Sequence, residues 1–400
     1  MMATEAASPA PLHWRNLFQR LLGEMDQRTS PDWLADQASL DPAIYRDPLR
    51  FEHERQRLFR RLPLCLGPAD QLREPGSAMA REICGVPVLM TRARDNTVKV
   101  FLNVCRHRGA RLVAGADEHW GEPCRRQSLV CPYHGWTYRL DGTLAGVPRA
   151  EAFPALDKPA SGLRELPSAV RHGMVWAVLT PSADAAAVAA PDIASFLGEL
   201  DRDLAAIGLG GHRLYRQHAI KRAANWKLIV EAFLEIYHVT RLHAGTIGPF
   251  FADAVAVSDA VGPHIRFLAA RDRTAEIRDL PAERWSLQHH GTLVHFVMPN
   301  SILIYHPDYI SHLGLFPTAP DETLFVHSML TPDTPGDDKA EAHWARSFEL
   351  IDAGVFNGED LPICEQIQRG LGSGANERLI VGRLEQNLRR FHGSLDAALA

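Results

Sequence analysis

The spacing of hydrophobic positions changes character near the middle of this 400-residue chain. In the first half, short apolar runs alternate with turn residues. Residues 86–105 hold two apolar runs around a polar turn at Asp95–Asn96, and residues 127–147 repeat the arrangement around Asp141–Gly142. Asp-Gly and similar pairs between apolar runs are typical of β-hairpins. With a further apolar run at 172–181, the pattern predicts a small domain built from short strands.

The second half has helical spacing near both of its ends. Apolar residues recur every three or four positions in 193–209 and 225–243, and again in 339–356 and 376–395, which is the period of an amphipathic helix. Strand-like runs lie between these segments, from about residue 265 to about residue 330. We therefore expect an α+β domain in this half of the chain.

These patterns divide the chain into three parts. We expect a helical segment at 1–45 that packs on the larger domain, a small all-β domain at 46–180, and the larger domain at 193–400. The larger domain is expected to have an antiparallel sheet flanked by helices. A low-information stretch at 182–192, rich in alanine, is expected to be a surface linker,.

Composition narrows the class of protein. The chain is 46% hydrophobic and 23% charged, with a formal net charge of −5, so charge gives no reason to expect nucleic acid or an anionic membrane as a partner. No secretory signal and no membrane-spanning run is evident. The six cysteines do not form a disulfide-type pattern,. We expect a cytoplasmic protein in which clustered cysteine and histidine bind metal.

Two couplets supply such a cluster. Cys105 and His107 are separated by one residue. After 23 intervening residues come Cys131 and His134, which are separated by two. Two thiolates and two imidazoles fit either a closed tetrahedral zinc site or a Rieske-type 2Fe–2S cluster, which takes two cysteines on one iron and two histidines on the other. Each couplet mixes the two residue types, as a loop that touches both irons requires, so the cluster is favoured and zinc remains the alternative.

The two motifs, C-R-H-R-G and C-P-Y-H-G-W, resemble the Rieske domain of the Rieske non-haem iron oxygenases, in their α-subunit type. The resemblance implies that Cys105, His107, Cys131 and His134 hold the cluster. The gap between the motifs is longer than the family usually has, with G-A-D-E-H-W-G-E-P-C-R-R-Q as an insertion. Cys124 lies in this insertion and is not expected to be a ligand. A simple Rieske ferredoxin would end near residue 150.

A second candidate metal site lies in 225–243. Glu235 and His238 are three residues apart, and His243 follows five later. On a straight helix the two imidazoles would diverge by about 140°, so we expect the helix to loosen after Tyr237. Two histidines and one carboxylate form the facial triad of non-haem Fe(II) oxygenases.

The stretch N-W-K…E-x-Y-H-x-x-x-x-H resembles the mononuclear iron signature of the same family, which implies that His238 and His243 are ligands and that the larger domain is of the helix-grip type. Most of the family has aspartate where Glu235 stands, as an acid that links the two metal sites. A glutamate at this position resembles the pattern in the branch of the family that acts on quaternary ammonium compounds. Glu231 is a rival for this role but lies a full turn from the pattern.

The third, acidic ligand is expected far downstream. Residues 356–371 resemble the C-terminal segment of the family, with Asp360 as the ligand and Glu359 as the alternative. A purely structural interpretation makes Asp360 the N-cap of a helix that has Pro362 in its first turn. Asp352 is less favoured because it lies inside a helical pattern.

The resemblance also implies an assembly. Electrons would pass from the cluster of one chain to the iron of its neighbour in a ring, most often a trimer. Glu235 would then bridge His238 and either His134 or His107 of the next chain. NAD(P)H would supply electrons through a separate reductase, with or without a ferredoxin. Arg106 and Arg108 are candidates either for docking an acidic redox partner or for bonding carbonyls near the cluster.

The chain is thus expected to be a terminal oxygenase that uses O₂ to hydroxylate or dealkylate a small organic substrate, with an aromatic compound favoured, as in aromatic hydrocarbon catabolism. The alternatives are oxidative demethylation or cleavage of a quaternary ammonium compound and, from another class, an electron-transfer or sensor protein without competent iron. The candidates for pocket-lining residues are Ala232, Phe233, Val239, Leu242, Val297, Ile302, Ile304 and Phe356. An aromatic cage for a cation is predicted from Trp285, Tyr305 and Tyr309.

Overall fold

A computed structural model describes residues 12–27, 29, 33–114, 122–182, 188–332 and 336–400. Parts of the expected N-terminal segment (1–11, 28 and 30–32), the insertion (115–121) and the linker (183–187) lie outside these described residues. The chain divides into two compact units, one formed by residues 54–196 and the other by residues 1–53 together with 197–400.

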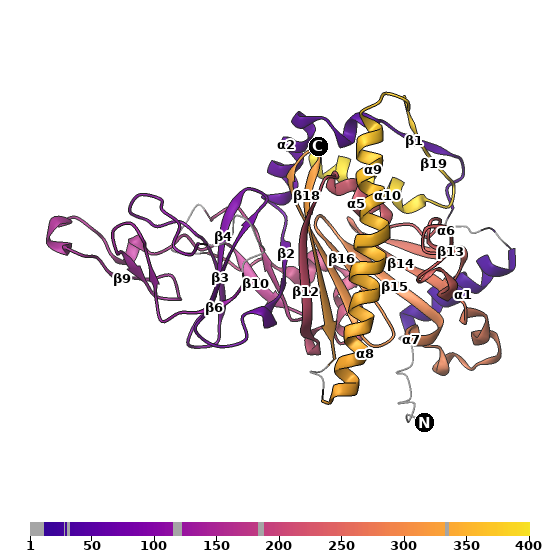
Figure 1. The fold of residues 1–400 in the computed structure, drawn as a ribbon, viewed down its shortest axis with the longest axis horizontal. Coiled ribbons are helices and arrows are strands. Elements are labelled where there is room, and N and C mark those ends of the chain that lie inside the picture. Colours follow the sequence, from indigo (N-terminus) through magenta and orange to yellow (C-terminus); the bar gives the residue numbers. More distant parts are fainter. Residues whose placement is uncertain (1–11, 28, 30–32, 115–121, 183–187, 333–335) are drawn as a thin grey trace. The chain divides into compact units, whose positions relative to one another are not determined.

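The 54–196 unit consists of short antiparallel strands in three sheets (Figure 1). The β4–β5 and β8–β9 hairpins lie where the sequence predicts them, with Asn96 and Gly142 in the left-handed backbone region at their turns. A four-stranded sheet has the order β5-β4-β3-β6, and two three-stranded sheets have the orders β10-β11-β2 and β7-β8-β9. The strands are β2 (Leu64–Pro68), β3 (Ser77–Ile83), β4 (Val86–Arg92), β5 (Val98–Leu102), β6 (Cys124–Arg125), β7 (Leu129–Val130), β8 (Thr137–Tyr138), β9 (Leu144–Gly146), β10 (Ser168–Arg171) and β11 (Met174–Ala177).

A hydrophobic core within this unit includes both cysteines of the couplets. Cys105 and Cys131 are buried there with Phe101, Trp136 and Tyr138. The core therefore fixes the two loops that carry the couplets, because each loop is anchored through a buried sulfur.

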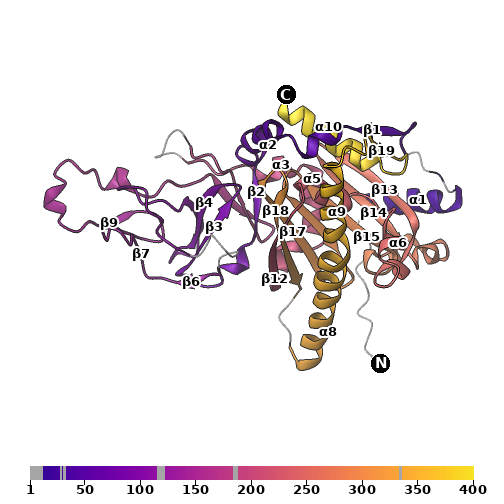
Figure 2. The same ribbon diagram turned by 45° about the horizontal axis from the view of Figure 1, so that its top comes forward.

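The second unit is organised around a seven-stranded antiparallel sheet (Figures 1 and 2). Its order is β12-β18-β17-β16-β15-β14-β13. From β13 to β18, strands that are consecutive in the chain are neighbours in the sheet, and β12 pairs with β18 at the other edge. The strands are β12 (Arg213–Arg222), β13 (Phe251–Val261), β14 (His264–Arg271), β15 (Gly291–Val297), β16 (Ser301–Tyr305), β17 (Ile310–Ala319) and β18 (Glu322–Thr331).

Helices cover both faces of this sheet. A long helical run, residues 338–371, crosses one face, as Figure 2 shows. Phe356 in this run contacts Phe325 of β18. On the other face, Asp203 bonds Trp14, Arg266 and His295. The main helices are α1 (Leu12–Gln27), α2 (Pro48–Glu54), α3 (Ile193–Leu197), α4 (Glu199–Ala206), α5 (Trp226–Ala232), α6 (Val239–Leu242), α7 (Leu287–His290), α8 (Asp338–Phe348), the π-helix η10 (Glu349–Asp360), α9 (Leu361–Leu371) and α10 (Gln386–Leu399). This arrangement confirms the expected α+β class.

One predicted helix is partly wrong. The segment 376–395 begins with a strand, β19 (Leu379–Val381), which pairs with β1 (Ala38–Leu40), and only then enters α10. Leu379-Ile380-Val381 is a short apolar run with β-branched residues, and a distant strand is available to it, so pairing overrides the helical period. Among the described helices, none has an apolar run long enough to cross a membrane.

Candidate metal centres

The two couplets lie on loops with the same backbone geometry. The Cys105 N–H donates to the Ala110 carbonyl at 2.8 Å, and the Gly109 N–H donates back to the Cys105 carbonyl at 3.0 Å. The second loop repeats both bonds at the same distances, from Cys131 to Trp136 and from Gly135 to Cys131. Gly109 and Gly135 both have positive φ angles, which other residues adopt at a cost. The spacing of cysteine and glycine therefore encodes two matching loops.

The sulfurs lie on the inner side of these loops. Cys105 and Cys131 are buried, and the Tyr138 hydroxyl lies 3.4 Å from the Cys105 Sγ and accepts a bond from the Arg106 N–H at 3.0 Å. Burial raises the pKa of Cys105 even though the bond with Tyr138 works against this, so its thiolate form needs a cation beside it. No pattern in the sequence predicts this contact between Tyr138 and Cys105. Asn103 closes the first loop by bonding Val113 and Leu112.

The imidazoles lie on the outer side. The Nδ1 atoms of His107 and His134 are 3.1 Å apart, and the His107 ring stacks on Trp136 at 4.9 Å between centroids. His134 is exposed. Two buried sulfurs and two converging outer nitrogens fit a cluster held by cysteines on one iron and histidines on the other.

The second site begins at a capped helix. Asn225 accepts from the Lys227 N–H at 2.9 Å and caps α5, which ends at Ala232. The chain then turns, and His238 and His243 flank the four-residue helix α6. The predicted loosening after Tyr237 is thus misplaced, because the helix breaks before His238. This break removes the divergence of the two imidazoles that a straight helix would impose.

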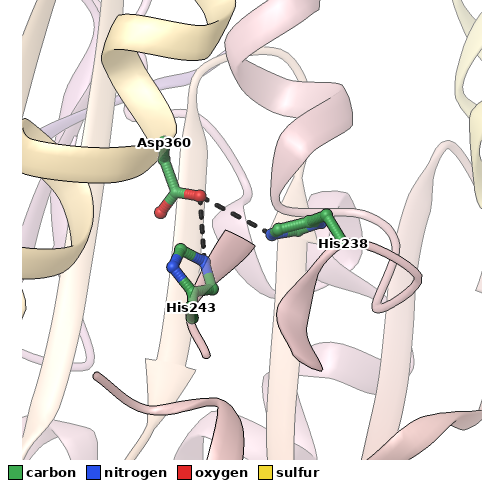
Figure 3. Close-up of side chains that lie close together, drawn as sticks. All are labelled: His238, His243 and Asp360. Atoms are coloured by element: carbon green, nitrogen blue, oxygen red, sulfur yellow. Dashed lines mark ion pairs between the residues drawn. The ribbon is translucent and has the colours of Figure 1, made fainter. Parts of the chain in front are cut away.

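Figure 3 shows Asp360 facing both histidines. Its Oδ1 lies 3.1 Å from His243 Nε2 and 3.6 Å from His238 Nε2. Ligand atoms of these three residues lie within 4.8 Å of one another. Asp360 Oδ1 is buried and no hydrogen-bond donor is aligned on it. An orphaned buried carboxylate oxygen between two imidazole nitrogens is the arrangement that a divalent cation would satisfy.

The other ring nitrogen of each histidine, Nδ1, bonds a second carboxylate. His238 Nδ1 bonds the Glu235 carboxylate, and His243 Nδ1 bonds Glu359 at 2.6 Å. Glu359 also accepts from Thr246 at 2.8 Å, a contact that the sequence did not suggest. Ligating histidines commonly donate their other ring N–H to a carboxylate in this way.

The charges agree with the geometry. Burial lowers the pKa of His238, but the neighbouring carboxylates of Asp360 and Glu235 outweigh this and raise the value to about 10. Burial raises the pKa of Asp360, and the two histidines reverse the effect and lower it. Positive charge is therefore favoured between Asp360 and the two histidines. A bound cation would supply that charge in place of protons.

The other carboxylates singled out in the sequence lie elsewhere. Glu231 bonds Tyr45 and His392, each at 2.8 Å. Asp352 bonds His327 and His218. The structural interpretation of Asp360 holds only in part: α9 begins directly after it, with Pro362 in the first turn, but Asp360 has helical φ −63° and ψ −56° and makes no side-chain cap.

The pocket candidates divide between the two faces of the sheet. Phe233, Phe325 and Phe356 form a cluster, with ring centroids 5.3 to 6.3 Å apart. Strand register puts Ile302 and Ile304 on the same face as this cluster. Val297 points to the opposite face because it follows Phe296, the cross-strand partner of Ile302,.

The predicted aromatic cage does not form. Trp285 packs edge-on against Phe18 and donates to backbone carbonyls, and Tyr309 stacks on His306 at 4.2 Å. Among the described residues, the rings of Trp285, Tyr305 and Tyr309 make no contact with one another. Sequence positions alone do not indicate whether these three rings meet in the fold.

Family models match both units. Residues 63–166 match the Rieske 2Fe–2S domain, and residues 211–400 match the catalytic domain of the ring-hydroxylating α subunit. The chain therefore belongs to the Rieske non-haem iron oxygenase α subunits, and its cofactors are a Rieske cluster and a mononuclear iron. The zinc alternative and the electron-transfer alternative do not account for the pair of domains.

Relatives within this class act on different substrates. A carnitine monooxygenase oxygenase subunit from Acinetobacter pittii is 27% identical over 339 residues, which cover 81% of this chain and 82% of that protein. A chlorobenzene dioxygenase α subunit from a Cupriavidus species is 32% identical over 232 residues, or 56% of this chain and 49% of that protein. A solved quaternary ammonium Rieske monooxygenase, described for carnitine oxidation and inter-subunit electron transfer, has a TM-score of 0.75 at 19% identity, covering 99% of this chain and 100% of that one. This last likeness shows a common fold.

Proposed function

We propose that Cys105, His107, Cys131 and His134 hold the Rieske cluster of this oxygenase, and that His238, His243 and Asp360 hold its mononuclear iron. The observation that carries the second assignment is the convergence of two Nε2 atoms on one buried carboxylate oxygen. Glu359 and Glu235 are then not iron ligands but residues that orient the ligating rings.

The iron in such a triad supplies a site where O₂ and substrate meet, with the cluster as the source of electrons. The surrounding residues have separate tasks. Glu235 holds the proton on His238 Nδ1 and fixes the ring so that Nε2 faces Asp360, and Glu359 does the same for His243 with help from Thr246. The buried phenylalanine cluster keeps water from the adjoining layer between sheet and helices,.

We further propose that the chain works in a ring, with three copies as the expected number. Glu235 would connect His238 to His134 or His107 of the next chain, and a reductase would supply electrons from NAD(P)H, with or without a ferredoxin. The exposed position of His134 supports this proposal, as does the inter-subunit electron transfer described for the similar structure. The six cysteines make no disulfide, which supports a cytoplasmic location.

The substrate proposed is a quaternary ammonium compound, which the enzyme would demethylate or cleave. Support comes from Glu235 in place of the usual aspartate and from the carnitine monooxygenase relative, which matches over most of both chains. Phe233 and Phe356 lie a few residues before Glu235 and Asp360, and their rings could contact a trimethylammonium group,. An aromatic substrate is the second candidate, because the chlorobenzene dioxygenase relative has higher identity over a shorter stretch.

The test is coupled oxygen uptake by the holoenzyme with a surrogate reductase. The substrates are carnitine, betaines and choline on one side, and aromatic acids and methoxyarenes on the other. We expect uptake with a trimethylammonium compound, with trimethylamine or formaldehyde as a product, and none from a His238→Ala variant. Product from the aromatic compounds alone would refute the proposed substrate class, and equal activity of the variant would refute the proposed iron site.

A further inference from the structure

We infer that a groove on the Rieske unit, lined by Arg94, Arg125 and Arg126, is the docking site for an acidic electron-donor protein. The inference rests on the proposed function, because it assumes that a separate protein delivers electrons to the cluster. None of the residues that line the groove belongs to the loops that carry the exposed imidazoles.

The groove is built where three strands end. Arg94 follows β4, and Arg125 and Arg126 lie at and just after β6, which pairs with the start of β3 at Ser77. Gly76 fixes the junction, since its N–H donates to Arg92, its carbonyl accepts from Arg126, and its φ is +97°. The resulting hollow has a volume of about 440 Å³.

The groove carries an excess of positive charge. Arg125 pairs with Glu74 at 3.0 Å, and this carboxylate offsets the charge of one of the three arginines. Within the part of the chain that the structure describes, Arg94 and Arg126 pair with no carboxylate, and Arg126 Nε instead lies 3.2 Å from the Cys124 sulfur. Both guanidinium groups thus remain able to bind carboxylates of a partner.

The groove also leads to the cysteine side of the cluster site. Leu140 forms part of its lining and belongs to the same core as Cys105 and Cys131. Two residues earlier in the chain, the Tyr138 hydroxyl lies 3.4 Å from Cys105 Sγ. The backbone from Leu140 to Tyr138, the Tyr138 side chain and this one hydrogen bond therefore connect the groove with the sulfur side of the cluster site.

The arginines beside the imidazoles suit this role less well. Arg108 stacks on the exposed ring of Tyr133 at 5.4 Å and bonds its hydroxyl. In the proposed ring, the imidazole face passes electrons to a neighbouring chain and is covered by it. Electrons can enter an assembled ring only through another face, and the groove provides one.

The experiment measures reduction of the Rieske cluster in the full-length holoenzyme by stopped-flow absorbance. The donor is a reduced plant-type ferredoxin, whose potential of about −400 mV is low enough for the transfer. The test variant is Arg94→Glu with Arg125→Glu and Arg126→Glu, and its matched control keeps the charge with lysine at the same three positions. We expect the test variant to lower the second-order rate constant at least about tenfold at low ionic strength, and the lysine variant to stay near wild type.

Two further measurements separate the possible failures. Reduction by dithionite, and product formed in one turnover of dithionite-reduced enzyme, should be unchanged in the glutamate variant. Loss of both in the wild-type enzyme would count against the proposed function rather than against the groove. The groove assignment is overturned by an unchanged ferredoxin rate, by a rate in wild-type enzyme that does not fall with salt, or by a larger loss from Arg106→Glu with Arg108→Glu.

Discussion

The hydroxyl of Tyr138 should raise the reduction potential of the cluster, and its removal gives a quantitative test. Its oxygen lies 3.4 Å from Cys105 Sγ in a fully buried position. Burial raises the pKa of Tyr138, so the phenol keeps its proton and can donate it to the sulfur. A bond to sulfur stabilises the more electron-rich, reduced cluster more than the oxidised one.

The size of the effect follows from the bond energy. A hydrogen bond to a charged group contributes about 1.5–3 kcal/mol. If about 1–2 kcal/mol of this differs between the two redox states, Tyr138→Phe lowers the potential by about 40–90 mV, because 59 mV corresponds to a tenfold change for one electron. The substitution also leaves the Arg106 N–H without its acceptor, which costs about 1–3 kcal/mol of stability.

The assay is a redox titration of the holoenzyme followed by visible circular dichroism, with thermal unfolding measured on the same samples. Tyr133→Phe is the control, because Tyr133 is exposed and its hydroxyl bonds only Arg108 among the described residues. We expect the control to keep the wild-type potential. A Tyr138→Phe potential equal to or above that of wild type would refute the assignment of the hydroxyl as a donor to the cluster.

Three other perturbations have expected outcomes. Glu235→Gln should keep both metals but lose most coupled turnover, and near-normal substrate-dependent oxygen uptake would contradict its bridging role. Glu359→Gln should weaken iron affinity about 10-fold to 100-fold, measured by competition with a chelator, since it frees the back of the His243 ring,; unchanged affinity would argue against orientation by Glu359. Asp203→Asn should lower the free energy of unfolding by about 1–3 kcal/mol, because a neutral amide replaces the buried charged partner of Arg266 and His295,. Burial raises the pKa of Asp203, but His295 and Arg266 reverse this and hold it below its usual value, so the stabilisation is complete above the unfolded value of about 3.9 and is lost as pH falls through the folded value; a difference between wild type and variant that grows in acid would contradict this.

The matching geometry of the two loops that carry Cys105 and Cys131 was predictable from the sequence because it is local. Cysteine, histidine and glycine recur at nearly fixed spacing around Cys105 and Cys131, and backbone bonds within each loop complete the geometry. Asp360 was different, since it lies 117 residues beyond His243 in the printed numbering. Only the family resemblance pointed to it, and no pattern in residues 356–371 distinguishes a ligand from a helix cap.

Other features depend on contacts that sequence patterns do not contain. The helical period of 225–243 continues through the turn after Ala232, so the break that brings the histidines together was placed too late. Val297 was assigned to the pocket by its apolar character, but strand register decides its face. The prediction of an aromatic cage is wrong for a similar reason: Trp285 packs against Phe18, which lies on a helix far away in the chain.

The central claim is that one chain carries a cluster and a separate iron held by His238, His243 and Asp360. The most direct test is metal and sulfide analysis of the anaerobically purified wild-type protein and of Asp360→Ala. We predict about three iron atoms and two acid-labile sulfides per wild-type chain, and about one iron fewer in the variant with its Rieske spectrum unchanged. Two irons in the wild-type protein, or a variant that retains all three, would contradict the account.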